Sequence, residues 1–455
     1  MKKMLIFLMS ILTLVPTISQ IIACQIANEV EDPLTIGLGI DKSNALDSGV
    51  QNNPVSQFTN FFIVGDSLSD VNGVGSVLAN QIEPVVNLLM KKLLPDGILG
   101  MDIEIALEIA LDGQGYGFTN QYGYHSAFSN GATAGYLLSD ALGFENIQNS
   151  SMFETRPNNG TVYGKNYAVG GATAAQMQGV SGVLLNDVTV DRQVVSLLEQ
   201  HLINANDLVL FGIGGNDLFA LIDAYGNEKE IKRIFDEGIN AIKKGLFTLL
   251  NNGIKKVIFM TPPKLNDIPK YNYLFSSTDE DDLELAKFID ELGQKYNKAI
   301  LSIIAEVNSY YNTSIEIFDL YNGFTDIVNW FKQTNSTAVV DKEFTTSSDV
   351  FVVTGSDGLI IEESYYQGDW LRDDRELYTI EEFIEILSGL TTENITLNNF
   401  NSRITYTIPL SLVMLAIRGT DDGEDINNYF FIDYVHPSAA VHEYVSKLLI
   451  DLITE

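Results

Sequence analysis

Three residue types that can act together as a nucleophilic triad stand near the two ends of the chain. Ser67 lies in the segment 65–70 (GDSLSD), and Asp433 and His436 lie in the segment 433–437 (DYVHP). A serine hydroxyl is a weak nucleophile, so it needs an imidazole to accept its proton and a carboxylate to orient that imidazole. Because Asp433 precedes His436 by only one tight turn, its carboxylate can lie beside Nδ1 and leave Nε2 free to face Ser67. The pattern predicts acyl transfer through a serine nucleophile.

Two interior segments supply donors for the negative charge that develops in such a reaction. The segment 214–217 (GGND) follows an apolar run, and the side-chain amide of Asn216 can donate a hydrogen bond to a substrate carbonyl oxygen. The segment 166–174 (NYAVGGATA) offers the backbone N–H of Gly171 with no side chain to block close approach. Together with the N–H of Ser67, these groups form the predicted oxyanion hole.

The elements that must position these segments alternate along the chain. Asn60–Val64 is an apolar, aromatic and β-branched run typical of a buried strand, and the serine follows its carboxyl end, where open α/β sheets bind ligands. Further patterns predict helix 192–202, strand 207–211, helix 228–251, strand 255–260, helix 281–308, strand 314–319 and a final helix 437–453. This alternation predicts a parallel sheet with helices on both faces.

On these residues the chain resembles the SGNH (GDSL) hydrolases. The blocks at 65–70, 166–174, 214–217 and 433–437 occur in the order of that family. A further stretch, Phe128–Gly131 before a helical segment, is similar to the secreted lipase, lecithinase and hemolysin branch. The resemblance spans about residues 59–455 and implies an α/β fold, a three-layer α/β/α sandwich of flavodoxin-like type with a central parallel sheet.

The resemblance also implies roles for the residues in these blocks. Ser67 would be the nucleophile, His436 the base and Asp433 the orienting carboxylate, and the oxyanion donors would be Ser67, Gly171 and Asn216. We expect a carboxylic ester hydrolase that acts on a lipid or phospholipid ester. A carbohydrate O-acetyl esterase is the alternative, because the triad does not distinguish leaving groups. A catalytically idle surface adhesin on the same scaffold is disfavoured by the intact set of triad and oxyanion residues.

The remaining histidines and glycine pairs suggest no second site. His125, His201 and His442 have no aspartate in a matching turn, so we expect them at the surface or at the edge of the core. The pairs at 73–75 and 212–214 are too short for a dinucleotide fingerprint and are interpreted as turns. No cofactor and no metal site are therefore expected.

The N-terminus has the features of a bacterial lipoprotein signal. A charged start is followed by the mostly apolar Met4–Val15, which is short for a spanning helix, and Ile21–Cys24 resembles a lipobox. We expect residues 1–24 to be the signal and a lipidated Cys24 to hold the protein at the extracellular face of the cell membrane. An ordinary cleaved signal and secretion are the alternative. Since Cys24 is the only cysteine, no intramolecular disulfide is expected.

Length and composition fit one elaborated domain. With 455 residues and 45% hydrophobic content the chain can bury a sizeable core. We expect a polar tether over 25–58 and a hydrolase domain over 59–455 with insertions near 78–115 and 325–430. These insertions either form an acyl-chain pocket or bury a small core of their own. The aromatic candidates for lining such a pocket are Trp330, Phe331, Tyr365, Tyr366 and Trp370.

The chain is strongly acidic. Its formal net charge of −33 argues against nucleic-acid binding and against electrostatic docking on anionic lipid, because both need basic patches. The acidic runs 279–282 and 421–425 are expected to be solvated loops, and neither has the spacing of an EF-hand.

Overall fold

The computed structural model describes residues 32–47, 57–93, 102–113, 116–150, 163–178, 182, 185–311, 315–344, 349–355, 360–366, 405–416 and 425–454. The chain divides into two compact units. The larger unit comprises Val30–Val77, Leu111–Thr346 and Arg418–Glu455, and the smaller unit includes Leu78–Ala110 and Ser347–Ile417.

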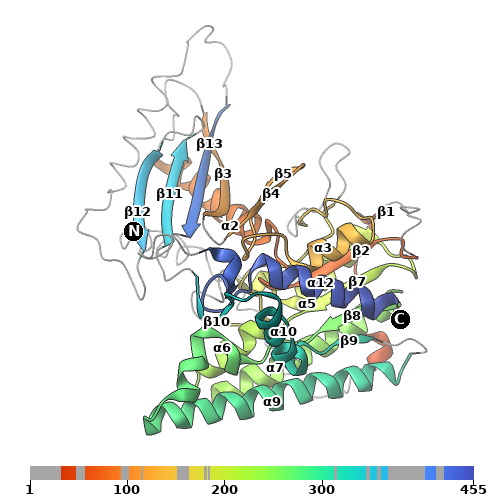
Figure 1. Cartoon of the computed structure of the whole chain (residues 1–455). Helices are drawn as coiled ribbons and strands as arrows, with labels where there is room; N and C mark the ends of the chain where they lie inside the picture. Colours follow the sequence, from red (N-terminus) through yellow and green to blue (C-terminus); the bar gives the residue numbers. More distant parts are fainter. Residues whose placement is uncertain are drawn as a thin grey trace, which may run out of the picture. The chain divides into compact units, whose positions relative to one another are not determined.

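A parallel sheet forms the centre of the larger unit (Figure 1). Its strands are hydrogen-bonded in the order β2 (Phe61–Gly65), β7 (Leu208–Gly212), β8 (Lys256–Met260) and β9 (Glu316–Phe318). All four residues of Phe61–Val64 are fully buried, as expected for a parallel strand covered on both faces. The predicted strands therefore form the central parallel sheet, with bounds that differ by one or two residues.

The segment 165–169 extends this sheet beyond β2. Tyr167 N donates to Ile63 O (2.7 Å), and Val169 N donates to Gly65 O (3.2 Å). The chain thus passes from β2 to segment 165–169 along one edge of β2, and then to β7 along its opposite edge. This is the flavodoxin-like strand order. In such sheets ligands bind where the order reverses, outside the carboxyl ends of the strands. In this sheet the strand order reverses between β2 and β7, so the ligand site is expected outside the carboxyl ends of these two strands.

Helices cover both faces of the sheet, as the three-layer prediction required (Figure 1). One layer contains α3 (Ala134–Ala141), α10 (Leu320–Thr334) and α12 (Ala439–Thr454). The other layer contains α5 (Val190–Gln200), α6 (Gly215–Asp223), α7 (Glu228–Asn251) and α9 (Glu280–Asn308). In α7 the buried positions Ile234, Gly238, Ile242 and Leu246 repeat every four residues, which gives the helix one core-facing stripe.

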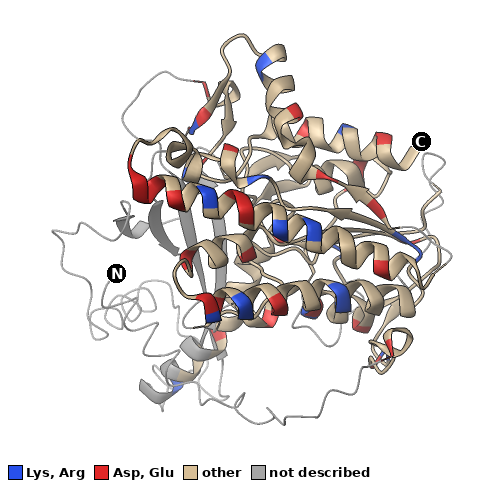
Figure 2. Cartoon of the chain, turned by 90° about the horizontal axis from the view of Figure 1, so that it is seen from below, with Lys and Arg blue, Asp and Glu red and all other residues tan. Residues whose placement is uncertain are grey.

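The acidic run 279–282 is not a solvated loop, contrary to the expectation from sequence. Asp279 is the N-cap of α9, and its carboxylate accepts from Asp281 N (2.9 Å) and Asp282 N (3.4 Å). Acidic side chains are favoured there because the amino end of a helix carries a partial positive charge. Figure 2 shows this acidic amino end of α9 in red. Along the rest of the helix both acidic and basic side chains occur.

Several short elements complete the larger unit. The antiparallel pair β4 (Phe118–Asn120) and β5 (Gly123–His125) precedes α3, and α8 (Pro269–Asn272) lies between β8 and α9. Strand β10 (Val339–Glu343) pairs in parallel with β14 (Tyr429–Phe431), so residues 325–344 of the predicted insertion 325–430 belong to the larger unit. None of the described helices is long and apolar enough to cross a membrane.

Part of the predicted tether 25–58 packs against the larger unit. Strand β1 (Leu46–Asp47) pairs with β6 (His201–Leu202), and the 3-10 turn Pro33–Thr35 lies beside α7. Asn251 Nδ2 donates to Pro33 O (2.9 Å) and to Ile36 O (2.8 Å). Residues 32–47 are therefore docked rather than free, while the predicted signal 1–24 lies outside the described residues.

The smaller unit contains a sheet of its own. Its strands are ordered β12 (Ile360–Tyr366), β11 (Asp349–Gly355), β13 (Thr405–Ala416) and β3 (Asp102–Gly113). Strand β11 is antiparallel to both of its neighbours. Helix α2 (Gly73–Leu93) begins in the larger unit and continues into the smaller one. The domain boundaries expected from sequence stay predictions.

Candidate active site

Ser67, His436 and Asp433 form a hydrogen-bonded chain. Ser67 stands just beyond the carboxyl end of β2, and the other two residues follow β14. Ser67 Oγ lies 2.7 Å from His436 Nε2, and His436 Nδ1 lies 2.7 Å from Asp433 Oδ2. The fold thus brings together residues 369 positions apart in the sequence. This geometry suits proton transfer from the serine hydroxyl to the imidazole.

The carboxylate of Asp433 holds the turn that carries the imidazole. Its Oδ1 accepts from Val435 N (2.9 Å) and from His436 N (2.7 Å), while Oδ2 faces the ring. Burial by itself raises the pKa of Asp433, but the charge of His436 and these hydrogen bonds outweigh it, so the pKa lies below its ordinary value. An ionised Asp433 accepts Nδ1–H, which leaves the Nε2 lone pair toward Ser67.

Tyr116 also donates to the triad carboxylate, a contact that the sequence did not suggest. Its hydroxyl lies 2.8 Å from Asp433 Oδ2, the oxygen that faces His436. Tyr116 directly follows the predicted insertion 78–115, where no motif or periodicity marks it. The two residues are 317 positions apart, so only the folded chain reveals the pair.

The stretch Phe128–Gly131 contacts His436 and the start of the helix that follows it. The ring of Phe128 packs against the imidazole of His436 at 4.9 Å between centroids. Asn130 Oδ1 accepts from Ala439 N (2.8 Å) at the start of α12, just after the catalytic turn. A Cβ at Gly170 would lie 2.2 Å from the Phe128 ring, so this position must be glycine for the ring to reach the imidazole.

The predicted oxyanion donors come from loops at adjacent strand ends. Asn216 lies in the first turn of α6, and its Nδ2 donates to Ala172 O (2.9 Å), which holds the amide beside Gly171. Gly171 has φ +80°, a left-handed conformation that glycine adopts without strain. Ser67 follows β2, the strand next to β7, so its N–H lies at the same edge of the sheet.

Two buried aspartates hold the loop that carries Gly171. Asp70 accepts from the backbone N–H groups of Gly73, Val74 and Gly170, and thus ties the first block to the second. Asp217 accepts from Ala174 N (2.9 Å) and Ala175 N (2.8 Å), and thus ties the third block to the second. Both aspartates lie inside the sequence blocks, but the sequence alone assigned them no role.

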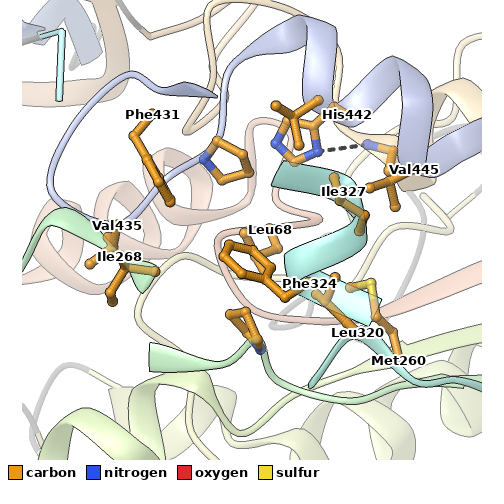
Figure 3. A pocket seen from close by; sticks show the side chains of 14 residues that line it. Leu68, Met260, Ile268, Leu320, Phe324, Ile327, Phe431, Val435, His442 and Val445 are labelled. Carbon is orange, nitrogen blue, oxygen red and sulfur yellow. Dashed lines mark hydrogen bonds between the residues drawn. The ribbon is translucent and has the colours of Figure 1, made fainter. Parts of the chain in front are cut away.

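An apolar pocket is lined in part by the sequence neighbours of Ser67 and His436, and Figure 3 shows its lining side chains. Its wall includes Leu68, the neighbour of Ser67, and Val435 and Pro437, the two neighbours of His436. The other lining residues come from α3, α10 and α12, from the last residues of β8 and β14 and from the segment after β8: Ala134, Met260, Pro263, Ile268, Leu320, Phe324, Ile327, Phe431, Val441, His442 and Val445.

Two of the aromatic residues proposed from sequence as pocket lining, Trp330 and Phe331, are described and do not line this pocket. Trp330 stacks on Tyr444 with centroids 3.7 Å apart, and Phe331 packs edge-on against Phe430 in the core. Both therefore contribute to packing between α10 and its neighbours. The side chains of Tyr365 and Tyr366 and the whole of Trp370 lie outside what the structure describes.

The other histidines are buried, which corrects the expectation of surface or core-edge positions. His125 lies within hydrogen-bonding distance of Asn72 and Asn120, and His201 Nε2 lies 3.1 Å from Gly164 O. His442 lines the apolar pocket. No group of three or more His, Cys, Asp or Glu residues that could hold a metal ion occurs among the described residues.

Comparison with known proteins places the chain in a family. No curated protein sequence matches it, while 29 chains of solved structures do. One of these is a mutant of an acetyl-xylooligosaccharide esterase from Geobacillus Stearmophilus. It is 12% identical to this chain with a TM-score of 0.26, and the match covers 60% of this chain and 81% of that chain. The family profile for GDSL-like Lipase/Acylhydrolase matches residues 61–449. The chain therefore belongs to the GDSL lipase/acylhydrolase family and is a carboxylic ester hydrolase.

Proposed function

We propose that this hydrolase cleaves its ester through an acyl-enzyme on Ser67. The observation that carries the proposal is the continuous hydrogen-bonded chain from Ser67 Oγ through His436 to an ionised Asp433. In the first half-reaction Nε2 takes the hydroxyl proton as Oγ attacks the ester carbonyl. The resulting imidazolium faces Asp433 and then gives its proton to the departing alcohol. A water repeats the sequence in the second half-reaction and releases the acid.

The oxyanion formed in each attack is stabilised by donors that are already in place. We assign these donors as the N–H groups of Ser67 and Gly171 and the side-chain amide of Asn216. An amide nitrogen carries two hydrogens, and one of those on Asn216 is used by Ala172 O (2.9 Å), which leaves the second for the oxyanion. Because these donors are held by the fold, little reorganisation is needed as charge develops.

A fluorophosphonate probe tests the nucleophile directly. We expect one modified residue, Ser67, and no labelling of Ser67→Ala. Ser67→Ala and His436→Ala should each abolish ester turnover while their far-ultraviolet circular dichroism stays that of the wild type, because triad members act as a unit. Labelling that persists in Ser67→Ala would show that another residue is the nucleophile.

For the ester itself we propose a lipid or phospholipid, supported by the apolar residues that flank Ser67 and His436 in the pocket wall. A carbohydrate O-acetyl ester is a second candidate, favoured by the small volume of that pocket, about 40 Å³. Chromogenic esters of increasing acyl length distinguish the two. A maximum at eight or more carbons, roughly the range of lipid acyl chains, supports the first candidate, and a maximum at acetate supports the second.

We also propose that a lipidated Cys24 anchors the enzyme at the extracellular face of the bacterial membrane. This proposal is supported by the lipobox-like Ile21–Cys24 after a short apolar stretch. The net charge of −33 makes electrostatic adsorption on anionic lipid unfavourable, so a covalent lipid anchor would be needed to hold the enzyme there. Secretion after ordinary signal cleavage is the alternative.

A further inference from the structure

A buried side-chain amide binds the end of β2, the strand that leads to the nucleophile. Gln193 lies on α5 and is fully buried. Its Oε1 accepts from Gly65 N (2.7 Å), and its Nε2 donates to Gly65 O (2.8 Å) and to Val188 O (3.0 Å). A side-chain amide offers one acceptor oxygen and two N–H donors. The oxygen and both N–H groups of Gln193 are therefore bonded within the protein, and none of them contacts the substrate.

The amide takes the place of a backbone group in the central sheet. The segment that extends the sheet beyond β2 pairs with it through the bond from Ile63 N to Lys165 O (3.0 Å). In a regular parallel pair the same pattern, two residues further along, joins Gly65 N to Tyr167 O. Gly65 N donates to Gln193 Oε1 instead. A side chain from α5 therefore completes the hydrogen bonding at the carboxyl end of β2.

This point of the sheet lies just before both backbone donors of the proposed oxyanion hole. Val169 N donates to Gly65 O at 3.2 Å. Ser67 comes two residues after Gly65, and Gly171 comes two residues after Val169. Two residues span at most about 7 Å, so neither donor can move far unless this pair moves with it. The geometry of the pair therefore contributes to the distance between the two donor N–H groups.

Gly65 depends on its backbone bonds for its position. A Cβ at this residue would lie 2.5 Å from Gly212 O on β7, so only glycine fits between the two strands. Without a side chain, the residue cannot be held by packing of its own. Gln193 supplies two of the bonds that hold its peptide groups.

The third bond of the amide reaches the segment that holds the Gly171 loop. Val188 ends a short 3-10 turn directly before α5. At the start of α5, Val190 N donates to Thr173 O (3.1 Å), two residues beyond Gly171. Gln193 thus connects the end of β2 with the part of the chain that binds the loop of the second backbone donor.

We propose that Gln193 is a positioning residue for the oxyanion hole, and that its amide fixes the distance between the backbone N–H groups of Ser67 and Gly171. Because Gln193 does not touch the substrate, it affects the stabilisation of the developing oxyanion and not the binding of the uncharged ester. The inference rests on the proposed acyl-Ser67 intermediate and its oxyanion donors. It applies to a lipid ester and to an O-acetyl sugar alike, because the same oxyanion develops in both.

Gln193→Met tests the proposal, because methionine has a similar length but makes none of the three bonds. We expect kcat to fall by about 10- to 10²-fold, since a misplacement of about 1 Å can cost about 10²-fold in rate. KM should change by less than about twofold, as expected for an interaction that acts only in the transition state.

A trifluoromethyl ketone provides a second measurement, which a merely structural role would not change. Ser67 Oγ adds to its carbonyl carbon, the hydroxyl proton passes to His436, and the carbonyl oxygen becomes an oxyanion in the oxyanion hole. We expect its inhibition constant for Gln193→Met to rise by about the factor by which kcat/KM falls, because an analogue of the transition state uses the same donors.

Gln200→Met is the matched control. Gln200 lies on the same helix with 3% of its surface exposed, and its Oε1 accepts from the Tyr167 hydroxyl (2.6 Å). Its replacement should lower the melting temperature while kcat and the inhibition constant change by less than about twofold. If Gln193→Met does not fold, Gln193→Asn replaces it. This variant keeps an amide but withdraws it by one methylene, so it cannot keep all three bonds, and the same changes in kcat and inhibition constant are expected.

The outcomes are distinct. Wild-type values of kcat and of the inhibition constant in the folded Gln193 variant overturn the inference. A loss of kcat that Gln200→Met reproduces also overturns it, as does a loss with an unchanged inhibition constant, which would place the defect outside the oxyanion hole. Failure of a fluorophosphonate to label Ser67 in the wild type would overturn the acyl-enzyme itself, and the inference with it. Normal labelling with unchanged kcat in the variant removes only the inference.

Discussion

Replacing Tyr116 by Phe should slow the enzyme without disabling the triad. The hydroxyl donates to Asp433 Oδ2 at 2.8 Å, and a hydrogen bond to a charged acceptor is worth about 1.5–3 kcal/mol. Loss of a donor to the ionised form raises the pKa of Asp433. That pKa starts below its ordinary value of 3.8, so the carboxylate stays ionised at neutral pH. The rate loss must therefore come from poorer positioning of the carboxylate.

The size of the loss can be bounded. Asp433 keeps its bonds from Val435 N, His436 N and His436 Nδ1, so the ring keeps its tautomer. Replacing the orienting aspartate of such a triad by asparagine lowers kcat by about 10⁴. We expect Tyr116→Phe to lower kcat about tenfold, with KM changed by less than about twofold, because the group acts on the base rather than on the substrate.

Steady-state kinetics and the rate of fluorophosphonate labelling measure this effect together. Both should fall in parallel, because both depend on removal of the Ser67 proton, whereas a purely structural role would move only the melting temperature. Tyr136→Phe is the matched control: its hydroxyl accepts from Asn120 Nδ2 (2.9 Å) outside the triad, so kcat should stay unchanged. Unchanged kcat and labelling in Tyr116→Phe, or a loss as large as that of Asp433→Asn, would refute the assignment of Tyr116 as a positioning residue.

Three further predictions follow from the structure and the sequence. Asn216→Ala should lower kcat by about 10²–10³-fold with a smaller change in KM, because it removes one donor to the oxyanion. A large fall in melting temperature with little change in kcat would instead show that Asn216 serves only to hold the loop through its bond to Ala172 O. Burial raises the pKa of Asp66 from 3.8 to about 7. The contribution of Asp66 to the free energy of unfolding is therefore present below pH 3.8 and lost as the pH rises through about 7, a change of about 4 kcal/mol. Urea unfolding should show a steeper pH dependence of stability in the wild type than in Asp66→Asn. Cys24→Ser should move the enzyme from the detergent phase to the aqueous phase with full activity, because multiple acyl chains contribute about 0.8 kcal/mol per buried CH₂; equal aqueous partitioning of both proteins would favour secretion.

Local patterns in the sequence were enough to predict the four strands of the central sheet and the helices α5, α7, α9 and α12, while α6 and α10 were not predicted. The run Phe61–Val64 is apolar without interruption because a central parallel strand is covered on both faces, so consecutive residues must all be apolar. The turn from Asp433 to His436 was predictable for the same reason, since its partners are three positions apart. The acidic run 279–282 was misjudged because charge alone does not distinguish a loop from the first turn of a helix.

Tertiary structure alone decided what surrounds the triad. Tyr116 reaches Asp433 across 317 positions, and Nδ1 of His442 meets the start of α3 across 308 positions. Neither pair leaves a periodic or motif signal, because each depends on how whole helices and strands pack rather than on neighbouring residues. The pocket wall likewise combines side chains from α3, α10 and α12 with the neighbours of Ser67 and His436. The residues of the triad could be found from the sequence because the chemistry demands their types, whereas the shape and polarity of the space beside them arise only when separate elements pack together.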